Sequence, residues 1–176
     1  MKRLLFIATF TFVISSCQKE NFEIVKCPPE ISERAFYFAK KYVESNTEYL
    51  WGGQDLLNKD TIKIDCSGLI VNCYKYAIVG TEYALLFDDI NVLGLYNQSY
   101  FHATPMRGDL IFFSENENSN PTHIGIVDTI KNEYVYFIDS TQKDDIGING
   151  VSVRKYKVDE EDVFFYFGSL KLKVAK

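Results

Sequence analysis

Hydrophobic residues in the first half of the chain recur every three to four positions, the spacing that places side chains on one face of a helix. Residues 30–45 follow this spacing, so the sequence predicts an amphipathic helix there. A second helix is predicted to begin at Asp65 or Cys66 and to run to about Ala77. Residues 88–100 are expected to hold a further short helix.

Later in the chain the pattern changes to short apolar runs separated by turn-forming residues, which is typical of β-strands. These runs predict strands over residues 109–113, 123–130, 134–140, 151–154 and 163–172. A short turn at residues 131–133 joins two of them. Because the helices come first and the strands follow, the predicted fold class is α+β, with amino-terminal helices packed on an antiparallel β-sheet.

The composition of the 176-residue chain is that of one ordinary globular domain. Apolar residues make up 47% of the chain, which excludes intrinsic disorder over its whole length. Aromatic residues reach 15% and favour strands, because their rings fit the half-buried surface of a sheet. The net charge of −5 gives no general attraction to phosphate backbones, so we expect no nucleic-acid partner.

The amino terminus has the features of a secretory signal. Lys2 and Arg3 precede an apolar run over residues 4–14 that is too short for an ordinary membrane-spanning helix. Residues 14–17, with the sequence ISSC, are similar to a bacterial lipobox, in which the cysteine, here Cys17, becomes the lipidated first residue. The alternative is a buried amino-terminal strand with an incidental cysteine.

The lipobox interpretation divides the chain into three parts. Residues 1–16 are the signal peptide, residues 17–29 are a lipidated tether, and residues 30–176 are the folded domain. We therefore expect an exported bacterial lipoprotein that is anchored to a membrane through acyl chains, facing the periplasm from the outer membrane.

Three further thiols would remain in the mature protein, at Cys27, Cys66 and Cys73. An odd number argues against a disulfide framework. Cys66 and Cys73 cannot pair if they share a helix, because seven residues at the helical rise separate them by roughly 10 Å. A bridge between Cys27 and Cys73 stays open.

The sequence offers the groups that a thiol peptidase needs: an ionisable cysteine, a histidine near it, and a residue that orients the histidine. Cys66 stands at a predicted helix start, where the helix dipole favours a thiolate. His123 begins a strand, and His102 is the other histidine of the chain. Asp139 ends the next strand and can meet His123 across an antiparallel pair. Each residue taken alone is more commonly structural.

Four motifs, in the correct order, resemble the NlpC family of bacterial cell-wall cysteine peptidases, which share a papain-like core. They are Tyr49-Leu50-Trp51-Gly52-Gly53, Asp65-Cys66-Ser67-Gly68-Leu69, residues 107–113 and His123-Ile124-Gly125-Ile126-Val127. The third motif departs from the family pattern, because Arg107 replaces its usual proline. The resemblance covers roughly residues 31–156.

The resemblance implies roles for the candidate residues. Cys66 would be the nucleophile and His123 the base. Tyr49 would donate its hydroxyl near the oxyanion, and the residues on either side of the nucleophile, Asp65 and Ser67, would line the pocket for the peptide stem. Both of these could instead only cap the helix. The third catalytic residue of the family is usually histidine, whereas Asp139 occupies its place here.

The function expected from the resemblance is that of a lipid-anchored cysteine endopeptidase that cleaves peptidoglycan stem peptides between D-glutamate and a diamino acid. No metal or other cofactor is expected, because two histidines without a paired ligand motif do not make a zinc site. Two alternatives remain: a papain-like amidase or acyltransferase that acts on another substrate, and a non-catalytic cell-wall binding module.

Overall fold

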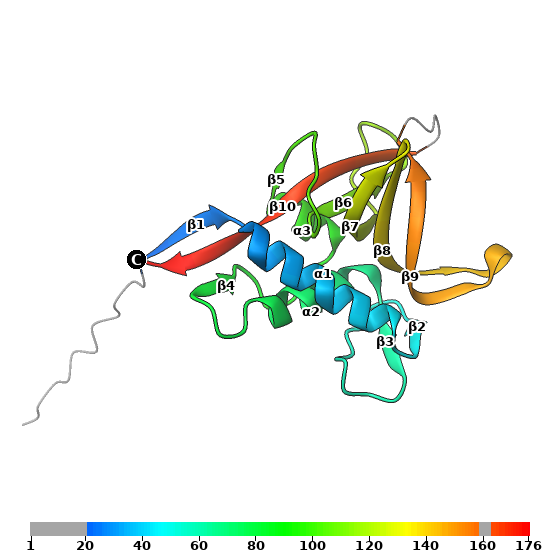
Figure 1. Cartoon of the computed structure of the whole chain (residues 1–176), viewed down its shortest axis with the longest axis horizontal. Helices are drawn as coiled ribbons and strands as arrows, with labels where there is room; N and C mark the ends of the chain where they lie inside the picture. Colours follow the sequence, from blue (N-terminus) through cyan, green and yellow to red (C-terminus); the bar gives the residue numbers. More distant parts are fainter. Residues whose placement is uncertain (1–20, 159–162) are drawn as a thin grey trace, which may run out of the picture.

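A large antiparallel sheet and two main helices make up the part of the chain that the computed structural model describes, residues 21–158 and 163–176 (Figure 1). The sheet has the order β1-β10-β6-β7-β8-β9, and β4 and β5 also pair with β10. Its strands are β1 (Phe22–Lys26), β4 (Tyr83–Leu85), β5 (Ser99–Phe101), β6 (Leu110–Ser114), β7 (His123–Lys131), β8 (Tyr134–Lys143), β9 (Ile148–Lys157) and β10 (Phe164–Ala175).

The remaining elements come mostly from the first half of the chain. A separate parallel pair consists of β2 and β3, and a short 3-10 helix, η1, precedes β9. These elements are α1 (Pro29–Val43), β2 (Thr47–Tyr49), β3 (Ile62–Ile64), α2 (Cys66–Ala77), α3 (Val92–Asn97) and η1 (Asp144–Ile146). The predicted α+β class, with amino-terminal helices and an antiparallel sheet, is confirmed.

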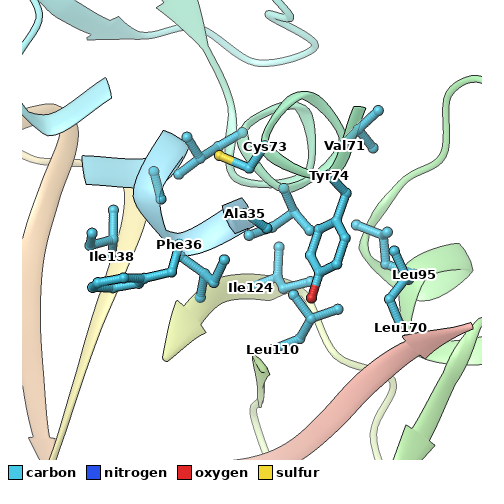
Figure 2. Close-up of a cluster of buried hydrophobic side chains, with 14 of the residues drawn as sticks. Ala35, Phe36, Val71, Cys73, Tyr74, Leu95, Leu110, Ile124, Ile138 and Leu170 are labelled. Atoms are coloured by element: carbon cyan, nitrogen blue, oxygen red, sulfur yellow. The ribbon is translucent and has the colours of Figure 1, made fainter. Parts of the chain in front are cut away.

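Helices α1 and α2 pack together and against the sheet through their apolar faces. Ala35 of α1 and Cys73 and Tyr74 of α2 are fully buried, and they meet Ile124 of β7 and Leu110 of β6 in the main core (Figure 2). This packing fixes the start of α2 beside the sheet strands that carry the other candidate residues.

The turn between β7 and β8 sets the register of the strands that follow. Asn132 and Glu133 both have positive φ, at 50° and 65°, which is the geometry of a tight hairpin turn. The predicted turn at residues 131–133 is therefore confirmed, and β7 and β8 pair directly.

The predicted tether over residues 17–29 needs a correction where the structure describes it. Residues 22–26 form β1, which pairs with β10 from Phe22 opposite Ala175 to Lys26 opposite Lys171. This segment mixes polar and apolar residues and was not predicted as a strand, because its pairing partner is the distant carboxyl-terminal strand. The folded domain thus begins before residue 30.

The signal peptide over residues 1–16 and the lipidation site Cys17 lie outside the described residues, so both stay predictions. In residues 21–158 and 163–176, no helix combines the length and the apolar character that crossing a membrane would require.

Candidate active site

Cys66 is the first residue of α2, and its neighbours hold the start of this helix in place. Oδ1 of Asp65 accepts hydrogen bonds from the amide of Gly68 at 2.7 Å and from Oγ of Ser67 at 3.0 Å. Its Oδ2 accepts from the amide of Gly52 at 2.8 Å. Asp65 therefore caps the helix and ties it to the turn that follows Tyr49.

The other two described cysteines are unsuited to nucleophilic chemistry. Cys27 and Cys73 are free and buried, so the bridge between them that the sequence left open is not formed. Burial raises the pKa of Cys27 to about 11 and raises the pKa of Cys73 still further above its usual range. Cys66 is also free and buried, but unlike the other two it lines an open cleft.

His123 and Asp139 meet across β7 and β8, as their positions in the sequence predicted. Nε2 of His123 lies 2.6 Å from Oδ2 of Asp139. The register pairs Ile126 with Ile138, which places Asp139 diagonally across from His123 on the same side of the sheet. Asp139 is fully buried, whereas a quarter of the His123 side chain is exposed. The carboxylate thus fixes an imidazole that still reaches the surface.

The protonation of His123 is shaped by both of its partners. Burial lowers the pKa of His123, but the hydrogen bonds that it makes with Asp139 and with Cys66 outweigh burial and raise the pKa to about 9. Because Nε2 faces Asp139, Nδ1 is the ring nitrogen that is left to act on Cys66. With its pKa raised to about 9, His123 is an imidazolium at neutral pH.

Arg154 of β9 completes the polar cluster, and the sequence analysis did not predict its position there. Its Nη1 donates to Oδ2 of Asp139 at 2.8 Å, so the same carboxylate oxygen serves both His123 and Arg154. The guanidinium also lies over the rings of Phe137 and Tyr156, at 5.7 and 5.2 Å from their centroids. Arg154 is placed to hold the orienting carboxylate, one step removed from the reacting atoms.

A cleft of about 450 Å³ opens beside Cys66. Tyr49, Asp65 and Ser67, the residues that the family resemblance pointed to, all line it. Burial raises the pKa of Tyr49, and negative charge on Cys66 and Asp65 raises it further, so the hydroxyl keeps its proton and can act as a donor. The lining also includes residues that the sequence analysis did not predict there: Asp89, Ile90, Asn91, Val92, Leu93, Pro121 and Thr122.

His102 belongs to a different cluster. Its Nε2 lies 3.3 Å from Oδ2 of buried Asp109 and 3.4 Å from Oγ of Ser169. His102 therefore contacts the residue before the start of β6 and the middle of β10. His123 is the histidine that accompanies Cys66.

In the part of the chain that the structure describes, no group of three or more histidine, cysteine or acidic side chains is arranged to hold a metal ion. The groups that the site does bring together, a thiol, an imidazole and a carboxylate, are those of cysteine-based acyl transfer.

A cysteine at a helix start and a histidine–carboxylate pair on adjacent strands of an α+β fold form the arrangement that is typical of papain-like thiol enzymes. The sequence profile of the NlpC/P60 family matches residues 46–159, and the chain belongs to this family. Members of the family are generally cysteine peptidases that act on peptidoglycan. No curated protein matches the sequence.

Two solved structures resemble the fold. One is described as similar to a lipoprotein of the NLP/P60 family from Staphylococcus aureus subsp. aureus Mu50, with 19% identity and a TM-score of 0.48 over 86% of this chain. The other is Ly7917, with 12% identity and a TM-score of 0.47 over 78% of this chain. The chain spans 44% and 62% of their respective lengths.

Proposed function

We propose that the chain is a lipid-anchored cysteine endopeptidase that hydrolyses peptidoglycan stem peptides between D-glutamate and a diamino acid. The observation that carries this proposal is the 2.6 Å contact of His123 with Asp139, together with the position of Cys66 at the start of α2 on the wall of an open cleft. Family membership supplies the cell-wall context.

The geometry supports a two-step acyl transfer. The Cys66 thiolate would attack the scissile carbonyl, and the oxyanion of the tetrahedral intermediate would form near the Tyr49 hydroxyl and the Cys66 amide, which as the first amide of a helix has no intrahelical acceptor. The His123 imidazolium would protonate the leaving amine through Nδ1. Water would then attack the thioester, with the neutral imidazole as base, and release the acyl group.

The charge of the cleft supports a substrate that carries an amino group. Asp65 and Asp89 are the charged residues among the described residues that line it, and both are acidic. The Asp65 carboxylate is already occupied by hydrogen bonds from the helix start and from Gly52. Asp89, which is exposed, is therefore the carboxylate placed to attract the side-chain ammonium of a diamino acid.

Digestion of purified peptidoglycan, followed by mass spectrometry of the released fragments, tests the proposed bond. The expected products carry a new D-glutamate carboxyl end and a new diamino-acid amino end, and Cys66→Ala should release none. Release of other fragments would favour a different amidase or an acyltransferase. Binding to the wall without any release by the wild type would favour a non-catalytic binding module.

The lipid anchor is a separate part of the proposal and rests on the sequence of residues 14–17. Growth with a labelled fatty acid should label the wild type and leave Cys17→Ala unlabelled. Equal labelling of the two proteins would remove the anchor from the proposal without touching the enzymatic part.

A further inference from the structure

The end of the sheet formed by β1, β10 and β4 has one side that faces solvent. Directly paired residues point to the same side of a sheet, so the strand register identifies the side chains on this surface. We call it the basic–aromatic face, and it consists of Phe22, Ile24, Lys26, Ala84, Lys171, Lys173 and Ala175.

Large apolar side chains are open to solvent on this face. Phe22 is 48% exposed and Ile24 is 47% exposed. The other side of the same strands is covered, because Leu85 and Leu172 belong to the main core and Val25 packs against it. On the basic–aromatic face, Phe22, Ile24, Lys26 and Ala175 are exposed, and Ala84, Lys171 and Lys173 are partly exposed.

The face carries three basic residues, and Glu82 lines a hollow together with Phe22, Ala84 and Lys173. Lys26, Lys171 and Lys173 form no ion pair within the described parts of the chain, although the whole chain carries a net charge of −5. The ammonium of Lys173 lies 5.8 Å from the centroid of the Phe22 ring, and that of Lys171 lies 5.2 Å from the Tyr100 ring. Lysines beside exposed aromatic rings are typical of surfaces that meet the membrane–water interface.

The face also lies where the predicted anchor would bring the membrane. The described chain begins at Asn21, next to β1, and Cys17 lies four residues earlier in the sequence. Four residues reach at most roughly 14 Å. The β1–β10 end lies at one end of the long axis of the molecule, whereas β8 and β9, which carry Asp139 and Arg154, lie toward the other (Figure 1).

We propose that the basic–aromatic face lies on the anionic phospholipid surface of the membrane and thereby directs the cleft away from the bilayer, toward the wall. This orientation rests on the proposed lipid anchor at Cys17 and adds to it. The acyl chains hold the protein at the membrane, and the lysines and Phe22 fix which side of the domain faces the lipid.

Tryptophan fluorescence can report this orientation. The lipidated full-length protein is reconstituted into vesicles of phosphatidylethanolamine and phosphatidylglycerol that carry brominated acyl chains, which quench nearby tryptophan. The chain has one tryptophan, Trp51, which is 84% exposed and lines the cleft. We expect Trp51 to stay unquenched in the wild type, whereas Phe22→Trp adds a tryptophan that loses most of its fluorescence.

A charge-reversal variant tests the basic residues. Lys26→Glu, Lys171→Glu and Lys173→Glu together should restore the fluorescence of the tryptophan introduced by Phe22→Trp. The matched control reverses the exposed lysines Lys40, Lys75 and Lys131, which lie outside the face, and should leave the quenching intact. Since charge reversal can disturb folding, high salt with the unchanged lysines provides a second measurement and should also reduce the quenching.

Flotation of the wild type with the vesicles separates the possible failures. Protein that floats without quenching of the introduced tryptophan would overturn the orientation and leave the anchor standing. Equal quenching of Trp51, quenching insensitive to both charge reversal and salt, or self-association through the face would also overturn it. Protein that does not float would reject the anchor and the orientation together. Peptidoglycan digestion, measured separately, tests the enzymatic proposal.

Discussion

Arg154 and Asp139 form an enclosed ion pair between β9 and β8, with Nη1 of Arg154 donating to Oδ2 of Asp139 at 2.8 Å. The same oxygen lies 2.6 Å from Nε2 of His123. Oδ1 of Asp139 is buried and has no hydrogen-bond partner among the described residues. The position of the carboxylate therefore depends on the two side chains that share one oxygen, and Arg154 is the one that has no step in the proposed reaction.

Replacement of this arginine should weaken catalysis without weakening substrate binding. In Arg154→Met the Asp139 carboxylate loses a charge-assisted hydrogen bond, a contribution of about 1.5–3 kcal/mol, so we expect kcat to fall by roughly 10- to 100-fold. KM should change little, because Arg154 does not line the cleft. Steady-state kinetics on a stem peptide measure both parameters.

A second arginine provides the matched control. Nε of Arg107 lies 2.9 Å from Oδ1 of Asp128 in a pair that is exposed at the surface. Arg107→Met should leave kcat within about twofold of the wild type, since surface ion pairs contribute little. Arg154→Lys should retain more activity than Arg154→Met, because the charge remains. Wild-type kcat in a folded Arg154→Met would show that the carboxylate is held without the arginine.

Substitutions at Asp139 should separate the hydrogen bond from the charge. Asp139→Asn should keep measurable activity, because an amide oxygen can still accept from His123. Asp139→Ala should lose more, because nothing then fixes the ring. Turnover of a stem peptide ranks the variants, and wild-type turnover by a folded Asp139→Ala would mean that another residue orients His123.

The Asp139 variants need a separate control for loss of stability. Both Asp139→Asn and Asp139→Ala leave the charge of Arg154 enclosed and without its ion-pair partner. Breaking one side of a buried pair costs about 3–5 kcal/mol. The double variant Asp139→Ala, Arg154→Met removes both charges and should recover part of this loss in thermal unfolding. It should not recover activity, which distinguishes a catalytic defect from an unstable fold.

The sequence predicted the helices and strands that are determined by residues close together in the chain. The apolar spacing over residues 30–45 and the cap at Asp65 depend on neighbours within a few residues, so α1 and α2 lie where they were expected. The contact of His123 with Asp139 was predictable for a related reason, because a short turn joins their strands and limits the possible registers.

The features that the sequence did not reveal depend on pairing between distant segments. Strand β1 could not be predicted from its own residues, because its pairing partner is β10, at the other end of the chain. In the sequence, Arg154 is one of the polar residues of a predicted strand. Only the register of β8 and β9 places it beside Asp139. The cleft lining at residues 89–93 leads into α3 and includes its first residues, and although a short helix was predicted there, its position beside Cys66 depends on packing that no local pattern specifies.

Cys73 should matter for stability and not for the chemistry. It is fully buried in the main core and lies two helical turns after Cys66 (Figure 2). Cys73→Ala should lower the free energy of unfolding by about 1–2 kcal/mol through lost packing, with kcat close to that of the wild type. Cys66→Ala should show the reverse, a folded protein without turnover. Loss of kcat in a folded Cys73→Ala would contradict the assignment of a single reactive thiol.

The pH dependence of activity should follow His123. The imidazolium must be present to protonate the leaving amine, and the pKa of His123 is raised from 6.5 to about 9. We therefore expect kcat/KM to hold through neutral pH and to fall as the pH rises through about 9, because kcat/KM reports the ionisation of the free enzyme. In Asp139→Asn this alkaline limb should move to lower pH, because a neutral amide supports the imidazolium less well than a carboxylate does.

The same raised pKa predicts how stability changes with pH. A group whose pKa is higher in the folded protein binds its proton more tightly there, so its stabilising contribution is complete below the unfolded value of 6.5 and is lost as the pH rises through about 9. Thermal unfolding between these two pH values should show a decline in the wild type that is smaller in Asp139→Asn. A decline of equal size, together with an alkaline limb at the same pH in both proteins, would mean that Asp139 does not set the protonation of His123.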